Sequence, residues 1–454
     1  MKATTTYENK KVLVLGLARS GVAAAKLLNH LGAFVTVNDA KSIEGNEEAN
    51  ELLENGVTII AGSHPADLLD EGFSLIVKNP GIPYTNPILE QAMERKIPII
   101  TEVELAYQVS EAPIVGITGT NGKTTTTTMI GNILEQSRSY HQVSLAGNIG
   151  FPASEVVTNA IETDILVTEL SSFQLMGIEQ FKPDIAVITN LFEAHLDYHG
   201  SREEYVKAKW NIQNNMTASD YLVVNANQEE LIALSKTTQA KVIPFSSERK
   251  VVTGAYLEDG KLYYQEEYIM DGTDIGVPGI HNIENALAAI CVAKLLGTSN
   301  AVIKESLMCF SGVPHRTEYL GTFEGRKVYN DSKATNILAT QRALSGFDNQ
   351  EVVLIAGGLD RGNDFIELEP DLVGLKGIVV MGETSEKLTE SAKRVGIEQI
   401  DKADNMTEAV SKAFELSEAE SVILLSPACA SWDQYKNFEI RGEAFASAIK
   451  TLHS

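Results

Sequence analysis

A glycine-rich turn between an apolar strand and a helix is the part of this sequence best suited to bind phosphate. The strand is expected at 114–118, and the turn after it carries Gly119, Gly122 and Lys123 before a threonine-rich helix start. Glycine lets backbone N–H groups approach phosphate oxygens, and the positive end of the helix dipole attracts an anion. Lys123 would reach the β- and γ-phosphates, and a threonine hydroxyl would bind Mg²⁺. The residues predicted to hold ATP here are Gly119, Thr120, Asn121, Gly122, Lys123, Thr124 and Thr125.

The spacing of this turn departs from the common Gly-x-x-x-x-Gly-Lys-Ser/Thr pattern, because Ile117 stands where the first glycine is expected. A purely structural glycine turn before a helix is the alternative. We favour phosphate binding, since strand, turn, lysine and threonine occur in the required order.

A carboxylate and an imidazole follow the next expected strands. Glu169 directly follows the strand at 164–168, and His195 lies in the loop after the strand at 184–189. Carboxyl ends of parallel strands meet at one sheet edge, so Glu169 would lie beside the glycine turn, where Mg²⁺ is needed. A solvated strand-end glutamate and a structural histidine are the simpler alternatives.

Several segments, in order along the chain, resemble the Mur ligases, the ATP-dependent amide ligases of peptidoglycan precursor synthesis, and the related folylpolyglutamate synthases. They are GITGTNGKTT, GNIG, TELSSFQL, NLFEAHLDYHG, EYVKAKW, GIHNIENALAA, GVPHRTE, NDSKATN and SPACASWDQYKNFEIRGEAF. The last segment resembles the branch of the family that adds D-glutamate. The Asp-Asn-Pro-Arg segment typical of the diaminopimelate- or lysine-adding branch does not occur.

The resemblance implies a site for ATP and two Mg²⁺ ions. Thr124 and Glu169 would bind metal, and His195 would share the second Mg²⁺ with Lys209. In this family that lysine is carbamylated, which gives it the oxygen donors that a hard cation prefers; a surface lysine, like nearby Lys207, is the alternative. The other implied ATP contacts are Asn285 at the adenine, Arg316 at the phosphates, Asp331 at the ribose and Lys333 at the transferred phosphate. The residues expected to be catalytic are Lys123, His195, Lys209 and Lys333.

The first hundred residues imitate a dinucleotide-binding fingerprint. Gly16 and Gly21 follow the first expected strand, and Asp39 ends the second. Ala18 stands where the middle glycine is needed, and its side chain hinders the approach of a pyrophosphate, so NAD is disfavoured. The resemblance implies that this region binds the UDP of a sugar substrate instead. The implied contacts are Leu17, Ala18, Arg19, Asp39, Asn79 and Gly81, with Asn148 at the reacting end of the substrate.

The last third of the chain is implied to bind D-glutamate. An arginine suits a dicarboxylate, because its guanidinium can hold a carboxylate with two hydrogen bonds. The family commonly has lysine at the position of Arg361 and leucine at that of Trp432. The implied contacts are Thr335, Arg361, Ser431, Trp432 and Phe438.

Short apolar runs alternate with helical patterns, which predicts parallel sheets covered by helices. Strands are expected at 12–15, 34–37, 75–77, 114–118, 164–168, 184–189, 221–224, 352–355, 377–381 and 422–425, and helices near 20–31, 124–136, 202–214, 283–296, 384–395 and 437–450. A stretch around 251–277 is interpreted as a small β insertion. We predict an α/β fold of three domains: a Rossmann-like N-terminal domain (1–102), a central P-loop ATP-binding α/β domain (103–312) and a C-terminal Rossmann-like α/β domain (313–454).

Composition limits the partners. Among 454 residues, 37 Lys and Arg stand against 61 Asp and Glu, a formal net charge of −24. This charge repels nucleic acid and anionic lipid, so neither is expected as a partner. The three cysteines lack metal-ligand spacing, and no apolar run reaches about 18 residues. We therefore expect a cytoplasmic protein with small-molecule substrates, and a monomer.

The glycine turn predicts ATP binding, and the resemblance implies an ATP-dependent enzyme that adds D-glutamate to UDP-N-acetylmuramoyl-L-alanine through an acyl phosphate. The alternatives are another Mur ligase or a folylpolyglutamate synthase-like ligase, and a regulatory module that binds ATP without ligation.

Overall fold

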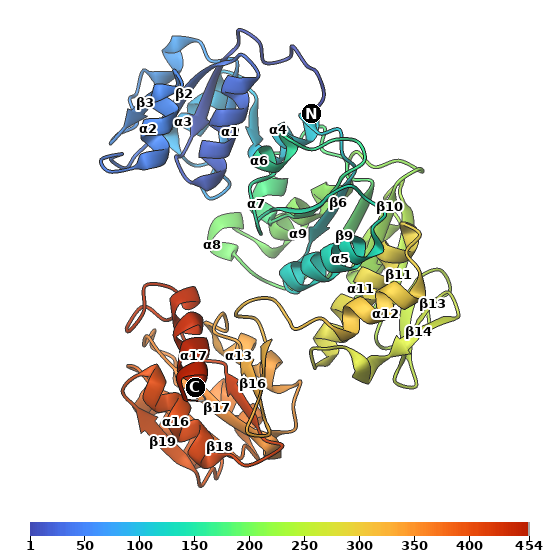
Figure 1. The fold of residues 1–454 in the computed structure, drawn as a ribbon. Helices are drawn as coiled ribbons and strands as arrows, with labels where there is room; N and C mark the ends of the chain where they lie inside the picture. The colour runs from blue at the N-terminus through green and yellow to red at the C-terminus, as the bar shows by residue number, and fades with distance from the viewer. Residues whose placement is uncertain (453–454) are drawn as a thin grey trace. The chain divides into compact units, whose positions relative to one another are not determined.

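The computed structural model describes residues 1–452, which form three sheets with helices on their faces (Figure 1). The chain divides into two compact units, of which the first comprises Met1–Met270 and Glu284–Ser306 and the second comprises Asp271–Ile283 and Leu307–Ser454. The first unit contains two of the sheets and the second unit contains one. The predicted α/β fold class is confirmed, whereas the boundaries at 102 and 312 stay predictions. No helix within residues 1–452 combines the length and the hydropathy that crossing a membrane requires.

The first sheet has five parallel strands in the order β3-β2-β1-β4-β5. Its central strand β1 is a run of valine and leucine that is buried on both faces, as expected of a parallel sheet between helices. Asparagine side chains cap α2 and α3 at their N-termini. The elements are β1 (Lys11–Leu15), α1 (Arg19–His30), β2 (Phe34–Asp39), α2 (Glu47–Glu54), β3 (Thr58–Ala61), η1 (Leu68–Glu71), β4 (Leu75–Lys78), α3 (Pro87–Glu94) and β5 (Ile99–Thr101).

The second sheet has nine strands in the order β14-β13-β12-β11-β10-β9-β6-β8-β7. Strands β6 to β12 pair in parallel, and β13 returns antiparallel to β12, so the β insertion predicted around 251–277 is confirmed. The strands are β6 (Ile114–Thr118), β7 (Val143–Gly147), β8 (Ile165–Glu169), β9 (Ile185–Ile188), β10 (Tyr221–Asn225), β11 (Lys241–Ser246), β12 (Ala255–Glu258), β13 (Lys261–Tyr264) and β14 (Glu267–Asp271).

The helices between β5 and the third sheet include the long α5, which leaves β6 through the glycine turn. They are α4 (Glu102–Val109), α5 (Lys123–Ser137), α6 (Ala153–Val157), α7 (Ser172–Leu175), α8 (Leu196–His199), α9 (Arg202–Trp210), η2 (Asn211–Gln213), α10 (Glu229–Ser235), η3 (Gly272–Asp274), α11 (Ile280–Leu295) and α12 (Asn300–Met308).

The third sheet has six strands in the order β15-β16-β20-β17-β18-β19, all parallel except the edge hairpin β15–β16. Alternate residues of β17 enter two separate cores, one on each face. The elements are β15 (Glu318–Phe323), β16 (Arg326–Asn330), α13 (Ile337–Leu344), η4 (Asn349–Glu351), β17 (Val352–Gly357), η5 (Ile366–Leu368), α14 (Glu369–Leu372), β18 (Gly377–Met381), α15 (Ser385–Arg394), β19 (Ile400–Ala403), α16 (Met406–Leu416), β20 (Val422–Leu425) and α17 (Phe438–Leu452).

Candidate active site

The glycine turn lies at the carboxyl end of β6, in the middle of the second sheet. Gly119 has a φ of 146° and Gly122 a φ of 79°. A Cβ on Gly119 would lie 1.9 Å from Thr189 Oγ1, and a Cβ on Gly122 would lie 2.2 Å from Asn285 Oδ1. Both positions therefore exclude a side chain. Gly122 is the N-cap of α5, whose first backbone N–H groups have no partner within the helix, so this end of α5 suits an anion.

Lys123 and Asn285 both lie at this turn. The ammonium of Lys123 donates hydrogen bonds to the carbonyl oxygens of Gly119 at 2.9 Å and Thr120 at 3.0 Å. Asn285 is buried, and its Oδ1 accepts a hydrogen bond from the Thr126 hydroxyl at 3.2 Å. The structure thus places these two predicted ATP contacts at one helix start.

Lys209 is buried beneath the same turn. Its Nζ donates to Gly119 O at 2.8 Å and lies 4.9 Å from the centre of the Tyr205 ring. Burial, and next the positive charge of Lys123, hold the pKa of Lys209 well below its usual value, although Glu169 opposes them. Lys207 is exposed instead and forms an ion pair with Glu204 at 3.6 Å. Lys209, and not Lys207, therefore faces the turn.

Glu169 lies beside the turn, because β8 pairs directly with β6. Its side chain is 2% exposed; Oε1 accepts a hydrogen bond from Asn148 Nδ2 at 2.9 Å, and the buried Oε2 has no hydrogen-bond partner. A buried carboxylate oxygen without a partner is unfavourable, so it indicates a place for a cation. Among residues 1–452 no three His, Cys, Asp or Glu side chains form a metal-binding group. Glu169 with threonine hydroxyls fits Mg²⁺, which keeps waters and phosphate oxygens as ligands.

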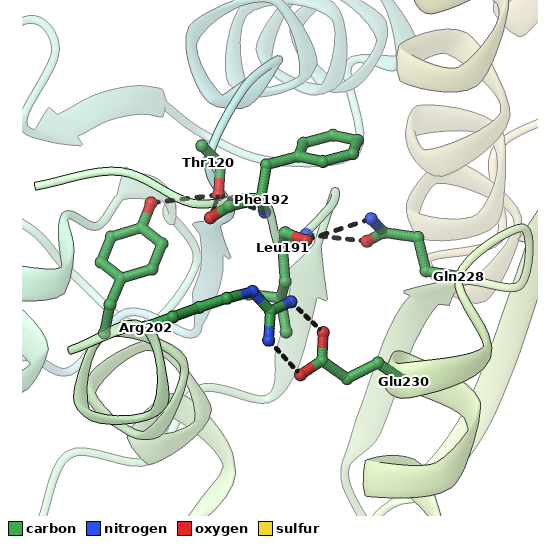
Figure 2. A network of polar contacts seen from close by, with 7 residues as sticks. Thr120, Leu191, Phe192, Arg202, Gln228 and Glu230 are labelled. Atoms are coloured by element: carbon green, nitrogen blue, oxygen red, sulfur yellow. Dashed lines mark hydrogen bonds and ion pairs between the residues drawn. The ribbon is translucent and has the colours of Figure 1, made fainter. Parts of the chain in front are cut away.

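The loop that carries His195 is fixed to the glycine turn. Figure 2 shows Thr120 bonded to Phe192 in both directions: Phe192 N donates to Thr120 Oγ1 at 2.9 Å, and that hydroxyl donates to Phe192 O at 3.2 Å. Gln228 bonds in the same way to Leu191, the residue before Phe192. Leu191 N donates to Gln228 Oε1 at 2.7 Å, and the Gln228 amide donates to Leu191 O at 3.2 Å. This loop therefore has a defined position relative to the turn.

His195 itself has a left-handed backbone, with φ of 55°, at the start of α8. Partial burial of its ring, and next the charge of Lys209, lower the pKa of His195 from its usual 6.5. At pH 7 the imidazole is therefore neutral, the form that binds a metal. The ion pair between Arg202 and Glu230 joins α9 to α10 beside this loop (Figure 2).

A pocket of about 340 Å³ lies next to Asn148 in the first unit. Five predicted substrate contacts line it: Ala18, Arg19, Asn79, Gly81 and Asn148. The pocket lining does not include Leu17 and Asp39, which bond to each other, Leu17 N to Asp39 Oδ2, at 2.6 Å. Ser20, Phe173 and Gln174 are among the lining residues that were not predicted from the sequence. Phe173 and Gln174 belong to the TELSSFQL segment, whose Ser-x-x-Gln pattern could have pointed to them. Gln174 completes the capping box of this helix.

In the second unit, Arg316, Asp331 and Lys333 lie close to one another. Asp331 Oδ1 accepts a hydrogen bond from Thr317 N at 3.1 Å, and Lys333 N donates to His315 O at 3.0 Å, next to Arg316. Burial raises the pKa of Asp331 to about 7, while hydrogen bonds and the Arg316 charge oppose this rise. These three predicted ATP contacts therefore form one group, and Lys123 and Asn285 form another in the first unit.

Among the predicted D-glutamate contacts, Arg361 and Trp432 form a pair, Phe438 and Thr335 contact Lys333, and Ser431 is buried. The Arg361 guanidinium lies 4.9 Å from the centre of the Trp432 ring, and the Lys333 ammonium lies 4.7 Å from that of Phe438. Thr335 N donates to Lys333 O at 2.9 Å, and Ser431 is buried. The roles of these residues stay predictions.

Arg441, which the sequence analysis did not single out, is 1% exposed. It donates to Ser332 Oγ at 3.1 Å, to Ser332 O at 2.8 Å and to Cys429 O at 3.0 Å. It thereby joins the loop of Lys333 to the loop of Ser431. Arg441 belongs to the last segment that resembles the family, but the local sequence does not indicate that its side chain is buried.

Three family models match the chain: the Mur ligase MurD-like N-terminal domain at 10–101, the Mur ligase middle domain at 117–293 and the Mur ligase glutamate ligase domain at 315–429. The UDP-N-acetylmuramoylalanine–D-glutamate ligase of Enterococcus faecalis is 66% identical over 452 residues, which cover 100% of this chain and 99% of the relative. That of Enterococcus hirae is 61% identical over 445 residues, covering 98% of this chain and 97% of the relative.

Two solved structures have a similar fold. The UDP-N-acetylmuramate-alanine ligase MurC from Thermotoga maritima matches with a TM-score of 0.61 at 22% identity, covering 97% of this chain and 99% of that one. The MurF ligase from the same organism matches with a TM-score of 0.57 at 16% identity, covering 99% and 97%. At these identities the structures support the fold alone. The three domain matches confirm the predicted three-domain organisation, and the chain belongs to the Mur ligase family.

Proposed function

We propose that this chain is an ATP-dependent ligase that joins D-glutamate to the carboxylate of UDP-N-acetylmuramoyl-L-alanine. The observation that carries the proposal is the glycine turn at β6, with Lys123 and Lys209 at its carbonyls and the unpartnered Glu169 oxygen on the next strand. This arrangement suits phosphoryl transfer, which depends on positioned cations. The choice of substrates rests on the relatives from E. faecalis and E. hirae. Both are named as D-glutamate ligases, and each matches this chain over nearly its whole length.

ATP is required because a carboxylate is a poor electrophile, whose leaving group would be oxide. A carboxylate oxygen of the UDP-sugar substrate attacks the γ-phosphorus, the bond to ADP breaks, and an acyl phosphate forms. The D-glutamate amine then attacks the acyl carbon, phosphate leaves with the electrons of the C–O bond, and the nitrogen releases a proton. Lys123 at the glycine turn, with Lys333 and Arg316, would neutralise the charge of the transferred group.

Thr124 and Glu169 are the residues that would hold one Mg²⁺, and His195 with Lys209 would hold the second. When bound, Mg²⁺ would neutralise phosphate charge and orient the phosphate oxygens. Lys209 would join this site as a carbamate, formed when its neutral amine adds CO₂ and releases a proton. Its burial and lowered pKa support this step, because only a neutral amine is nucleophilic.

The substrate pocket supports the remaining assignments. Arg19 lines it and provides a positive charge for the anionic UDP. Asn148 lies at the same pocket and bonds to Glu169, so the reacting carboxylate would lie between sugar and metal sites. D-Glutamate would be held in the second unit near Arg361 and Ser431. A cytoplasmic location and a monomeric state stay predictions, and light scattering of the purified chain would test the second.

The experiment that tests this function is mass analysis of the product made from ATP, UDP-N-acetylmuramoyl-L-alanine and D- or L-glutamate. We expect a D-glutamate adduct, ADP and phosphate in equal amounts, with no adduct from L-glutamate. ADP release driven by L-lysine or L-alanine would assign the chain to another branch of the family. ADP release without any amino acid, and without adduct, would favour an ATP-hydrolysing regulatory module.

A further inference from the structure

One carbonyl oxygen of the turn Asn79–Gly81 is held from two sides. Pro80 O accepts a hydrogen bond from Lys78 Nζ at 3.1 Å and another from the Tyr198 hydroxyl at 3.2 Å. Lys78 ends β4 in the first sheet, whereas Tyr198 lies on α8, directly after His195. The turn lines the 340 Å³ pocket. One wall of that pocket is therefore tied to the helical turn that begins at His195.

Tyr198 has a fixed place in this helical turn. Its backbone N–H donates to His195 O at 3.2 Å, and its ring packs edge-on against Phe173 with centroids 4.5 Å apart. Phe173 lines the same pocket and also packs against the His195 ring, at 5.2 Å. The Tyr198 hydroxyl also lies 3.0 Å from the carbonyl oxygen of Ile82, the residue that follows the turn. A carbonyl oxygen can only accept a hydrogen bond, so the Tyr198 hydroxyl is the donor.

Lys78 supports the turn from within the first sheet. Its side chain is 1% exposed, and its Nζ also lies 3.4 Å from Asn79 O. The ammonium is 4.9 Å from the centre of the Tyr84 ring, whose hydroxyl donates to Met176 O, after α7, at 3.3 Å. Burial lowers the pKa of Lys78 to about 8. A buried cation beneath this turn also attracts an anionic ligand in the pocket above it.

We infer that Tyr198 and Lys78 are positioning residues that lock the turn Asn79–Gly81 to the His195 helical turn, so that the UDP-sugar substrate and the phosphate-transfer site keep one fixed geometry. The inference rests on the proposed function and deepens it. It assigns to Tyr198 the alignment of the reacting carboxylate, and to Lys78 the placement of the turn that holds the UDP-sugar. ATP binding at the glycine turn does not depend on either residue.

The test compares Tyr198→Phe and Lys78→Met with the wild-type enzyme. For Tyr198→Phe we expect KM for UDP-N-acetylmuramoyl-L-alanine to rise about 3- to 10-fold, the effect of one lost hydrogen bond. We expect kcat to fall and KM for ATP to stay unchanged, because the glycine turn is intact. Lys78→Met should raise the same KM, and Lys78→Arg should restore part of it. The effects in the double variant should be less than additive, since both residues bond to Pro80 O.

Tyr268→Phe, in the β12–β14 insertion, is the matched control and should leave all three constants unchanged. Calorimetric titration of the UDP-sugar without ATP measures the binding effect independently of turnover, and a thermal melt separates it from loss of stability. Wild-type constants in Tyr198→Phe, or equal rises in both KM values together with a lower Tm, would overturn the inference while the proposed function stands. If the wild-type chain makes no adduct and binds no UDP-sugar, both fail.

Discussion

Two buried basic side chains, one in each unit, differ in how far burial lowers their pKa. Lys209, 2% exposed, bonds to the carbonyl of Gly119 under the glycine turn. Its pKa lies well below the usual value through burial and the neighbouring charge of Lys123. Arg441, 1% exposed, has a pKa that burial lowers only to about 10, and it makes three hydrogen bonds that join two loops.

This difference separates a chemical role from a structural one. A lysine amine can lose its proton when buried, and it then becomes a nucleophile that CO₂ can modify. A guanidinium keeps its charge, and its planar set of N–H groups can bond several carbonyls at fixed angles. We therefore expect that no side chain that stays positively charged can replace Lys209. Arg441 should matter more for the fold of the second unit than for the chemistry.

Lys209→Arg should show the largest effect. Arginine keeps the positive charge but cannot form a carbamate, so we expect kcat/KM to fall by about 1,000-fold, or roughly 4 kcal/mol of transition-state stabilisation. Steady-state kinetics measure this loss, and a thermal melt checks folding. Lys207→Arg, on the exposed face of the same helix, is the control. If added acetate restored part of the activity of Lys209→Ala, this would support a carbamate at Lys209, because acetate supplies a similar carboxylate group. Full activity of Lys209→Arg would contradict it.

Arg441→Met should act on stability. It leaves the carbonyls of Ser332 and Cys429 without donors inside the second unit, so we expect the free energy of unfolding to fall by about 3–5 kcal/mol. Urea denaturation measures this fall, and faster hydrogen exchange in β16 and β20 would locate it. Arg441→Lys should lose less, because it keeps the charge and some of the bonds. If Arg441→Met kept the stability of the wild type and lost activity, Arg441 would have a role in the reaction, as Lys209 does.

The sequence predicted the strands that are buried on both faces, because they are continuous apolar runs. Strands at the edges were missed, among them β3, β7 and the β15–β16 hairpin, since their residues are partly exposed and their runs are short or mixed. Elements of this kind are stabilised by pairing with a neighbouring strand, which no local pattern records.

For the site, the sequence predicted the glycine turn, Glu169 and Lys209 because their signals are local motifs. It did not single out Lys78 or Tyr198, which are about 120 residues apart and share one carbonyl only in the folded chain. Arg441 belongs to one of the recognised motifs, but its burial depends on the loops of Ser332 and Cys429, which follow β16 and β20. Contacts between distant segments, rather than residue type, define these positions.

One buried carboxylic acid in each unit allows the pH dependence of stability to be compared between the two units. Burial raises the pKa of Glu102 in the first unit and of Asp331 in the second to about 7. Between their usual values and about 7, the folded chain binds protons that the unfolded chain has released, so stability falls as pH rises and stays low above 7. At about 1.4 kcal/mol per pKa unit, the effect is at most roughly 3 kcal/mol for Glu102 and roughly 4 kcal/mol for Asp331. Glu102→Gln and Asp331→Asn should each remove part of this slope.

Urea melts at several pH values from 4 to 8 measure that slope. Hydrogen exchange in peptides of α4 and of β16 assigns it to the first or the second unit. Because Asp331 is also a predicted ribose contact, Asp331→Asn should in addition raise KM for ATP, whereas Glu102→Gln should not. A slope that persists in both variants would show that neither carboxyl carries the raised pKa.

The smallest effect is expected where a cation is exposed. Arg361 lies 4.9 Å from the Trp432 ring, and Trp432 is 65% exposed. An exposed cation–π contact contributes about 0.5–1 kcal/mol, so Trp432→Leu should raise KM for D-glutamate only about 2- to 5-fold, with kcat unchanged. Arg361→Lys should have a similar small effect, because lysine keeps the charge that attracts the dicarboxylate. Steady-state kinetics with D-glutamate as the varied substrate measure both. A loss as large as that of Lys209→Arg would mean that this exposed pair is desolvated when D-glutamate binds, since only removal from water makes such a contact strong.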